Sequence, residues 1–258
     1  MDNFSFEALK QRMESMQQSP EYQASCQRFS LECARLEAVA RGLYARKEEL
    51  QAHCDVATVR KERASGSTLH RGFYCPSPTY DLIVGNTKRG KLSKGLPVTS
   101  RHSHEYGFDT NGKLLYCKWL FKGQLTHTEY LVYGDSTVYG ITVEKDGRIS
   151  TITEEIYAQG KLRQFLRCLC IPTKDGFGCQ EIDCESYEYD SEGLCSCMMH
   201  HFMTPPQDVP EALSGLIPPM PYPIYRCDQY LFERKDGFLT GYTNTKGNSY
   251  PVRFRRKA

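Results

Sequence analysis

The chain has 258 residues, of which 40% are hydrophobic and 25% are charged, values that suit a globular protein with one large domain. Its 33 basic residues nearly balance its 31 acidic residues, so overall charge directs it neither to nucleic acid nor to a membrane. No apolar run approaches the roughly 20 residues of a membrane span, and the polar start MDNFSFEALKQRMESM lacks the features of a secretory signal. We therefore expect a cytoplasmic protein with no membrane contact, whose 12 cysteines are reduced thiols.

Residues 1–64 are predicted to be helical. After a first amphipathic stretch over 6–16, a helix is expected to begin at Ser19, which can act as its cap, because Pro20 suits the first helical position and Glu21 complements the helix dipole. Apolar residues then recur at alternating steps of four and three: Tyr22, Cys26, Phe29, Cys33, Leu36, Ala40 and Leu43. Such a stripe needs a partner. The partner could be the first helix in a hairpin, the rest of the chain, or the same helix of a second copy in a homodimer.

Residues 65–105 are predicted to form a basic, loop-rich connector. Its segment Gly85–His104 has four Lys or Arg residues within seven positions and no acid. We interpret this segment as a solvated loop, with contact to phosphate or to an acidic partner as the alternative. No aromatic residue interleaves to stack on bases, so nucleic-acid binding is not expected.

Residues 106–202 repeat one pattern, in which an apolar strand end, a polar pair, a glycine and a return strand follow one another. It occurs in YGFDTNGKLLY, ITVEKDGRIST, IYAQGKLRQF and YEYDSEGLCSC, and again in LFERKDGFLTG near the end of the chain. The glycines stand where hairpin turns need a positive φ. Their spacing of 11 to 17 residues from Gly112 to Gly193 fits one strand and one turn. The pattern predicts an antiparallel meander of β-hairpin repeats.

These repeats resemble two known families. YEYDSEGL and YGFDTNGKL resemble the tyrosine-aspartate (YD) repeats of Rhs-type polymorphic toxins, and FDTNGKLLYCKWLFKGQL with IYAQGKLRQF resembles the MORN-variant repeats of bacterial antitoxin-like proteins. The resemblance covers under half of the chain and implies sequential β-hairpins. A Rhs shell uses many tens of repeats to enclose a cargo, whereas this chain has five or six. The helical residues 1–64 belong to neither family.

In the middle strands, both odd-numbered and even-numbered positions carry apolar residues, which predicts that both faces of the sheet are buried. In the segment Leu114–Phe121 we assign Leu114, Tyr116 and Leu120 to one face, and Leu115, Cys117, Trp119 and Phe121 to the other. Something must cover the second face, and the amphipathic helical segment is suited to do so. The predicted fold is therefore α+β, with an N-terminal helical hairpin or long helix packed on an extended antiparallel β-meander.

Two segments complete the predicted organisation. Residues 203–224 are expected to form an irregular, proline-rich strap, because Met203–Pro223 contains seven prolines. Residues 225–258 are expected to form a terminal β-hairpin with a basic end.

Two clusters could carry chemistry. Cys168, Cys170, Cys195 and Cys197 could supply four thiolates to zinc, although Cys-x-Cys on a strand sets two thiols roughly 7 Å apart, and packing of buried thiols is the simpler interpretation. His102, His104 and His127 lie near Glu105 in sequence and could act as general bases in a hydrolase or nuclease. No nucleophile elbow, HExxH, P-loop or dinucleotide motif accompanies them. We therefore predict no catalytic residues, no cofactor and no enzymatic activity.

The acids of the segment 181–192 alternate with apolar or thiol residues, and we interpret them as a solvent-facing strand edge or as an acidic patch opposing a basic partner. The family resemblance implies a non-enzymatic, immunity or antitoxin-like protein that binds a partner protein, such as a toxin domain. The alternatives are a carbohydrate-binding or phage-like structural β-repeat module, in which Tyr116, Trp119 and Tyr130 would stack on sugars, and the hydrolase or nuclease. The residues expected to contact a partner are Tyr106, Tyr133, Glu185, Tyr187, Glu188, Tyr189, Asp190 and Glu192.

Overall fold

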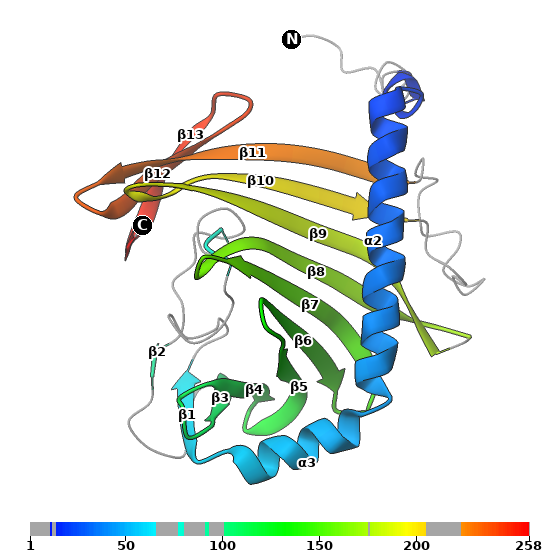
Figure 1. Ribbon diagram of the computed structural model, residues 1–258, viewed down its shortest axis with the longest axis vertical. Helices are drawn as coiled ribbons and strands as arrows, with labels where there is room; N and C mark the ends of the chain where they lie inside the picture. Colours follow the sequence, from blue (N-terminus) through cyan, green and yellow to red (C-terminus); the bar gives the residue numbers. More distant parts are fainter. Residues whose placement is uncertain are drawn as a thin grey trace.

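The structure is a computed structural model and describes residues 11, 14–65, 77–79, 91–92, 101–174, 176–204 and 223–257, with the backbone alone for 91–92 and 253–257. The described part is one antiparallel sheet of 13 strands with a long helix lying across it (Figure 1). From β3 to β13, strands that follow one another in the chain are neighbours in the sheet, and β1 and β2 extend it beyond β3. The predicted α+β meander is confirmed.

The helices are α2 (Pro20–Tyr44) and α3 (Lys47–Ala57). The strands are β1 (Arg60–Ser65), β2 (Lys91–Leu92), β3 (His102–Phe108), β4 (Leu114–Phe121), β5 (Gln124–Tyr133), β6 (Thr137–Glu144), β7 (Ile149–Ala158), β8 (Lys161–Thr173), β9 (Gly176–Asp190), β10 (Gly193–Met203), β11 (Ile224–Lys235), β12 (Phe238–Asn244) and β13 (Ser249–Lys257). In the described part of the chain, no helix is long and apolar enough to cross a bilayer.

Helix α2 begins where the sequence predicts. The side chain of Ser19 accepts a hydrogen bond from the backbone N–H of Tyr22 at 3.2 Å, and Pro20 occupies the first helical position. Six residues of the predicted stripe are buried, from Tyr22 to Ala40, and Leu43 packs beside them. The stripe lies on the sheet of the same chain, where the ring of Phe29 stacks on that of Phe202. The stripe is therefore buried within its own chain, so these residues are not free to form a homodimer interface.

The helical segment is shorter than predicted. It ends at Ala57, and Arg60–Ser65, which we expected to be helical up to about residue 64, forms β1. This strand pairs with β3 over six residues, so its backbone groups are satisfied by a ladder rather than by a helix. The sequence RKERAS lacks the apolar 3–4 spacing that holds α2 on the sheet.

The sheet also extends beyond the predicted repeat region. β3 begins at His102, within the predicted connector, and the predicted terminal hairpin is a set of three strands, β11 to β13, that continues the same sheet. The helix expected over 6–16 lies mostly outside the described residues, as do most of the connector and residues 205–222 of the proline-rich strap.

The hairpin turns confirm the role assigned to the repeated motif. Gly112 (φ 76°) and Gly147 (φ 87°) adopt the left-handed conformation that a side chain disfavours. In the first of these turns, the carboxylate of Asp109 accepts hydrogen bonds from the backbone N–H groups of Asn111 and Lys113, each at 2.8 Å. In this turn an acid three residues before the glycine therefore fixes the backbone.

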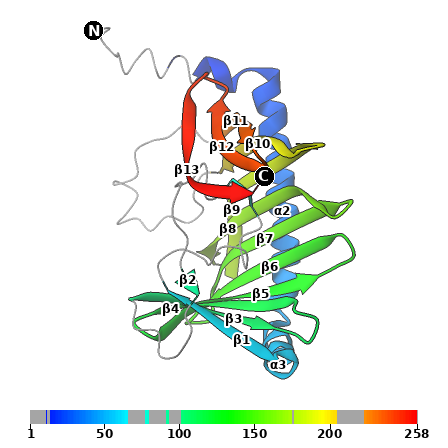
Figure 2. The ribbon, with the colours of Figure 1, turned by 90° about the vertical axis from the view of Figure 1, so that its left-hand side faces the viewer.

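The sheet is buried on both sides. Helices α2 and α3 lie on one face of the sheet, which we call the helix face (Figures 1 and 2). The helix face holds the largest core. The opposite or far face holds two smaller cores, one on β8–β12 around Phe165 and Phe232 and one on β1, β3 and β4 around Tyr106. Two-sided burial is what the sequence predicts for these strands.

At the start of β4, the side chains lie on other faces of the sheet than the sequence predicts. Leu115 and Tyr116 both belong to the helix-face core, whereas Leu114 joins Cys117 on the far face. The cause is a register shift: Gly107 pairs with Tyr116 and Phe108 with Leu114, so Leu115 is an extra, bulged residue. A β-bulge reverses the alternation of side chains from that point on.

Candidate functional site

Three cross-strand rows carry charged side chains on the far face, and we call them the polar rows. Each row joins residues that are direct partners in the ladder from β7 to β11. The first row is Glu155, Phe165, Glu185, Met199 and Asp228; the second is Thr153, Arg167, Asp183, His201 and Arg226; the third is Thr151, Leu169, Glu181, Met203 and Ile224. The rows contain five acids, two arginines and one histidine, so acidic residues outnumber basic ones there.

Asp183 is the centre of the polar rows. Its Oδ1 lies 2.8 Å from Nδ1 of His201, and its Oδ2 accepts a hydrogen bond from Nη2 of Arg167 at 3.1 Å. Burial disfavours the charged form of Asp183, but the hydrogen bond with His201 and the charge of Arg167 outweigh it, and the pKa of Asp183 is lowered. The carboxylate therefore stays ionised and lies between the guanidinium of Arg167 and the imidazole of His201.

Glu181, Asp183 and His201 could hold a metal ion. One ligand atom of each lies within 4.8 Å of those of the other two, and no second group of three such residues converges in this way in the described ranges. Two carboxylate oxygens and an imidazole nitrogen suit zinc or manganese. Arg167 competes for Asp183, so the same geometry also serves as a network of ion pairs without metal.

Two buried glutamates flank Phe165 in the first row. Glu155 is 7% exposed and accepts a hydrogen bond from the phenol of Tyr157 at 2.6 Å; burial raises its pKa to about 7. Glu185 is equally buried and accepts hydrogen bonds from Tyr187 at 2.6 Å and from Ser77 at 2.8 Å, and burial raises its pKa as well. Hydroxyl donors rather than cations satisfy these two carboxyl groups.

The predicted partner-binding residues divide into buried and accessible ones. Tyr106, Glu185 and Tyr187 are buried, so they support the far face from within and offer little surface to a partner. The remaining five are half-buried or exposed: Tyr133, Tyr189, Glu188, Asp190 and Glu192.

The exposed acids at the β9–β10 turn are already engaged within the chain. Asp190 forms a two-pronged ion pair with Arg234, with Nη1 and Oδ1 at 2.7 Å, and Glu188 accepts a hydrogen bond from Ser196 at 2.7 Å. The interpretation of these acids as a strand edge is wrong, because β9 lies between β8 and β10 inside the sheet. Alternation along β9 instead places Glu181, Asp183 and Glu185 together on the far face.

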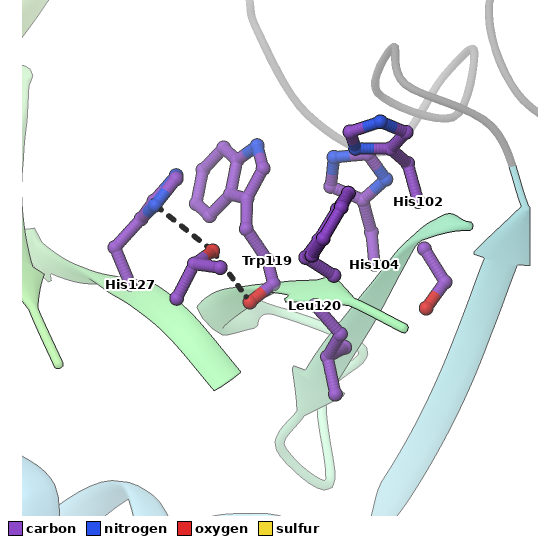
Figure 3. Close-up of a pocket in the computed structure, with 8 residues that line it drawn as sticks. His102, His104, Trp119, Leu120 and His127 are labelled. Carbon is purple, nitrogen blue, oxygen red and sulfur yellow. Dashed lines mark hydrogen bonds between the residues drawn. The ribbon is translucent and has the colours of Figure 1, made fainter. Parts of the chain in front are cut away.

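The three histidines of the sequence prediction do come together. With Trp119 they line a pocket of about 280 Å³ at β3–β5, in which the indole lies between the rings of His104 and His127 (Figure 3). The centroid of the Trp119 ring is 4.5 Å from that of His127 and 5.5 Å from that of His104. The pocket is lined by His102, Ser103, His104, Trp119, Leu120, Phe121, Thr126 and His127.

Glu105, by contrast, does not join the histidines. Its carboxylate pairs with Arg63 at 2.6 Å and accepts a hydrogen bond from Tyr116 at 3.2 Å, and Tyr116 belongs to the helix-face core. Glu144 lies beside one of the imidazoles instead, with an oxygen 4.0 Å from Nδ1 of His127. Burial lowers the pKa of His127, and Glu144 offsets part of this effect, so the ring is neutral near pH 7.

The aromatic residues proposed to stack on sugars also divide. Tyr116 and Tyr130 are buried in the helix-face core and are closed to a ligand. Trp119 is partly buried on the far face and lines the histidine pocket.

The thiols proposed for zinc lie on both faces of the sheet. Cys168 and Cys170 belong to the helix-face core, whereas Cys197 is in the far-face core around Phe165, and Cys195 is half-buried on the same strand. These four cysteines therefore do not form one metal site. Cys168 and Cys170 are instead grouped with Cys33 of α2 and Cys179 of β9.

The sequence prediction missed Arg167 and the pairing of His201 with Asp183. The sequence does contain one signal for Arg167 and Asp183. Each alternates with buried cysteines along its strand, which places both side chains on the face opposite those cysteines. What the sequence does not contain is the register that brings Arg167, Asp183 and His201 of β8, β9 and β10 into one row.

Comparison with known proteins adds no assignment, because no protein-family model and no curated protein matches the chain.

Proposed function

We propose that the protein is a non-enzymatic binding module of the bacterial immunity or antitoxin type, which recognises a basic partner domain through the polar rows and acts in the cytoplasm without a cofactor. The observation that carries this proposal is the excess of acids in the polar rows, on the face opposite α2. The hairpin repeats, which resemble those of toxin–antitoxin families, indicate the class of partner.

The physical argument concerns both charge and exposure. Glu181 and Asp183 retain 26% and 27% of their side-chain exposure, so a partner can reach them while the sheet holds them in place. Leu169, Met199 and Met203 stand half-buried among the charges and offer apolar contact area. A rigid acidic patch with apolar neighbours is suited to steer and then hold a basic domain. Many nucleolytic toxins are basic because they bind nucleic acid.

The test is co-expression with the product of the gene that adjoins its own, followed by measurement of association rates. Reversing two charges, in Glu181→Lys/Asp183→Lys, is expected to lower the association rate roughly tenfold at low salt. Glu48→Lys on α3, whose side chain is 77% exposed, changes the net charge away from the polar rows and is the control. Equal rates for both variants, or no complex with the wild-type chain, would overturn the proposal.

The histidine pocket supports a second candidate function, the binding of a small ring-shaped ligand such as a sugar. Its 280 Å³ volume and the indole of Trp119 carry this alternative. Trp119 is the one tryptophan of the chain, so a bound ligand should change the fluorescence directly. A panel of methyl glycosides that leaves the emission unchanged at millimolar concentration argues against it.

A further inference from the structure

Four cysteines form a continuous group of thiols beneath α2. Cys33 comes from α2, Cys168 and Cys170 from β8, and Cys179 from β9. Cys168 is in contact with both Cys33 and Cys179, and the sulfur of Cys170 lies 3.8 Å from that of Cys179. The sequence analysis names Cys168 and Cys170 as thiols and Cys33 as part of the helical stripe, but only the packing of α2 on the sheet and the β8–β9 pairing bring the four together.

Two of these thiols have the geometry of a disulfide pair. Cys170 and Cys179 are direct partners in the β8–β9 ladder, just after a register shift. Direct partners in an antiparallel ladder have Cα atoms about 4.5–5.5 Å apart, within the range of about 4.4–6.8 Å found for disulfides. Bonding requires the two sulfurs to close from 3.8 Å to about 2.05 Å, which side-chain rotation can supply.

The two thiols differ in their surroundings. Hydrogen bonds from Cys168 and Cys170 to the sulfur of Cys179 lower the pKa of Cys179, and the charge of Arg41 acts in the same direction. The pKa of Cys170 is raised, chiefly because it donates to Cys179, and also by burial. The thiolate is the nucleophilic form of cysteine, so Cys179 is suited to attack first.

The same two thiols are also the most accessible of the four. Cys179 is 9% and Cys170 is 7% exposed, against 4% for Cys33 and 0% for Cys168. A small oxidant can therefore reach the pair more easily than the other two thiols.

We propose that Cys179 and Cys170 form an oxidation site, which a hydroperoxide converts into a disulfide. In the first step the Cys179 sulfur attacks the peroxide; its S–O bond forms, the O–O bond breaks, and the released oxygen leaves as water after taking a proton. In the second step the Cys170 sulfur attacks the sulfenic acid, the S–S bond forms, and the remaining oxygen leaves as water. Two thiols and one hydrogen peroxide thus give one disulfide and two waters, and a dithiol reverses the change.

The new bond would lie under the contact between α2 and β9. Glu37 accepts a hydrogen bond from the backbone N–H of Cys179 at 3.0 Å, and Arg41 donates one to the carbonyl of Phe177. Oxidation therefore acts where the helix is tied to the sheet, at a site separate from the polar rows on the far face. This inference does not depend on the proposed binding function.

The experiment uses the full chain with Cys227→Ser, which removes an exposed thiol that would otherwise cross-link two molecules. The reduced protein is treated with one equivalent of hydrogen peroxide, free thiols are alkylated, and peptides are mapped without reduction. The expected product is a Cys170–Cys179 cross-link in most molecules, reversed by dithiothreitol. No cross-link, or a bond from Cys179 to Cys168 instead, overturns the proposal.

Variants distinguish the two roles. Cys170→Ser is expected to stop at oxidised Cys179, trapped by dimedone, and Cys179→Ser is expected to give neither product. Cys184→Ser is the matched control, because Cys184 is a 1% exposed thiol of the same helix-face core on β9, and it is expected to keep the full cross-link. If Cys184→Ser loses as much of the cross-link as Cys179→Ser, the assignment is overturned. If a variant misfolds, the peptide map of the protein that keeps both Cys170 and Cys179 still decides the question.

Discussion

Arg35 of α2 and Glu154 of β7 form a two-pronged ion pair across the contact between helix and sheet. Nη1 of Arg35 donates to Oε1 of Glu154 at 3.0 Å, and Nη2 contacts the other carboxylate oxygen. Glu154 is buried, at 3% exposure, whereas the side chain of Arg35 keeps 41% of its exposure and also pairs with Glu32. A buried carboxylate thus depends on a partly solvated cation that only the helix supplies.

Removing that cation should destabilise the fold. Arg35→Met leaves the Glu154 carboxylate buried without its cationic partner, and we expect the free energy of unfolding in urea to fall by about 1–3 kcal/mol. Adding Glu154→Gln should restore part of the loss. Arg46→Met is the control, because Arg46 pairs with Glu49 at the surface, where such a pair contributes less than about 1 kcal/mol. Similar losses in both single variants would contradict the expectation.

The fold could be predicted from the sequence wherever the residues of a single helix or strand carry the pattern that determines it. The stripe from Tyr22 to Ala40 and the cap at Ser19 are local patterns, and both the helix and its burial follow from them. The end of the helical segment does not follow from local pattern, because β1 gains its stability from pairing with β3, some 40 residues away. The bulge at Leu115 likewise depends on how β4 pairs with β3.

The candidate sites show the same limit. His102 and His104 share one strand face, so their proximity could be predicted, whereas their meeting with His127 requires the β4–β5 register. The polar rows could not be assembled from the sequence, because one residue of slip between β8 and β9 would move Asp183 to the helix face. Hydrophobic alternation gives the faces, but the ladder decides which side chains meet.

Gly107 is expected to tolerate no side chain. A Cβ at this position would lie 2.2 Å from Cε1 of the Tyr116 ring, which crosses the strand there. We expect Gly107→Ala to lower the free energy of unfolding by about 1–3 kcal/mol, because the buried ring must move. Gly42→Ala is the matched control: it lies in α2 with open space around it and should stabilise the protein by roughly 0.5–1 kcal/mol. Two changes of the same sign would contradict the close contact.

Glu155 should make stability depend on pH. Burial raises its pKa to about 7 in the folded protein, against about 4.3 in an unfolded chain. The folded state therefore holds the proton more tightly, and the stability linked to it is present below pH 4.3 and is lost as pH rises to 7. Relative to the wild type, Glu155→Gln should gain stability over this range, by no more than about 3 kcal/mol. Urea unfolding at several pH values tests this, and parallel curves for the two proteins would contradict it.

His127 and Trp119 should form an optical pH sensor. Their rings lie 4.5 Å apart, and Trp119 is the one tryptophan of the chain. A protonated imidazole in contact with an indole quenches its fluorescence, so emission should fall as His127 gains a proton. Burial lowers the pKa of His127, and the charge of Glu144, with an oxygen 4.0 Å from Nδ1, offsets this only in part.

The midpoint of quenching is therefore expected below pH 6.5, the usual value for histidine. His127→Gln should abolish the transition, whereas His102→Gln should keep it, because the ring of His102 packs on Phe121 instead. His104 also contacts the indole, at 5.5 Å and edge-on, so His104→Gln separates its contribution. A midpoint above 6.5, or a transition that survives in His127→Gln, would show that another group controls the indole and that His127 is charged or remote at neutral pH.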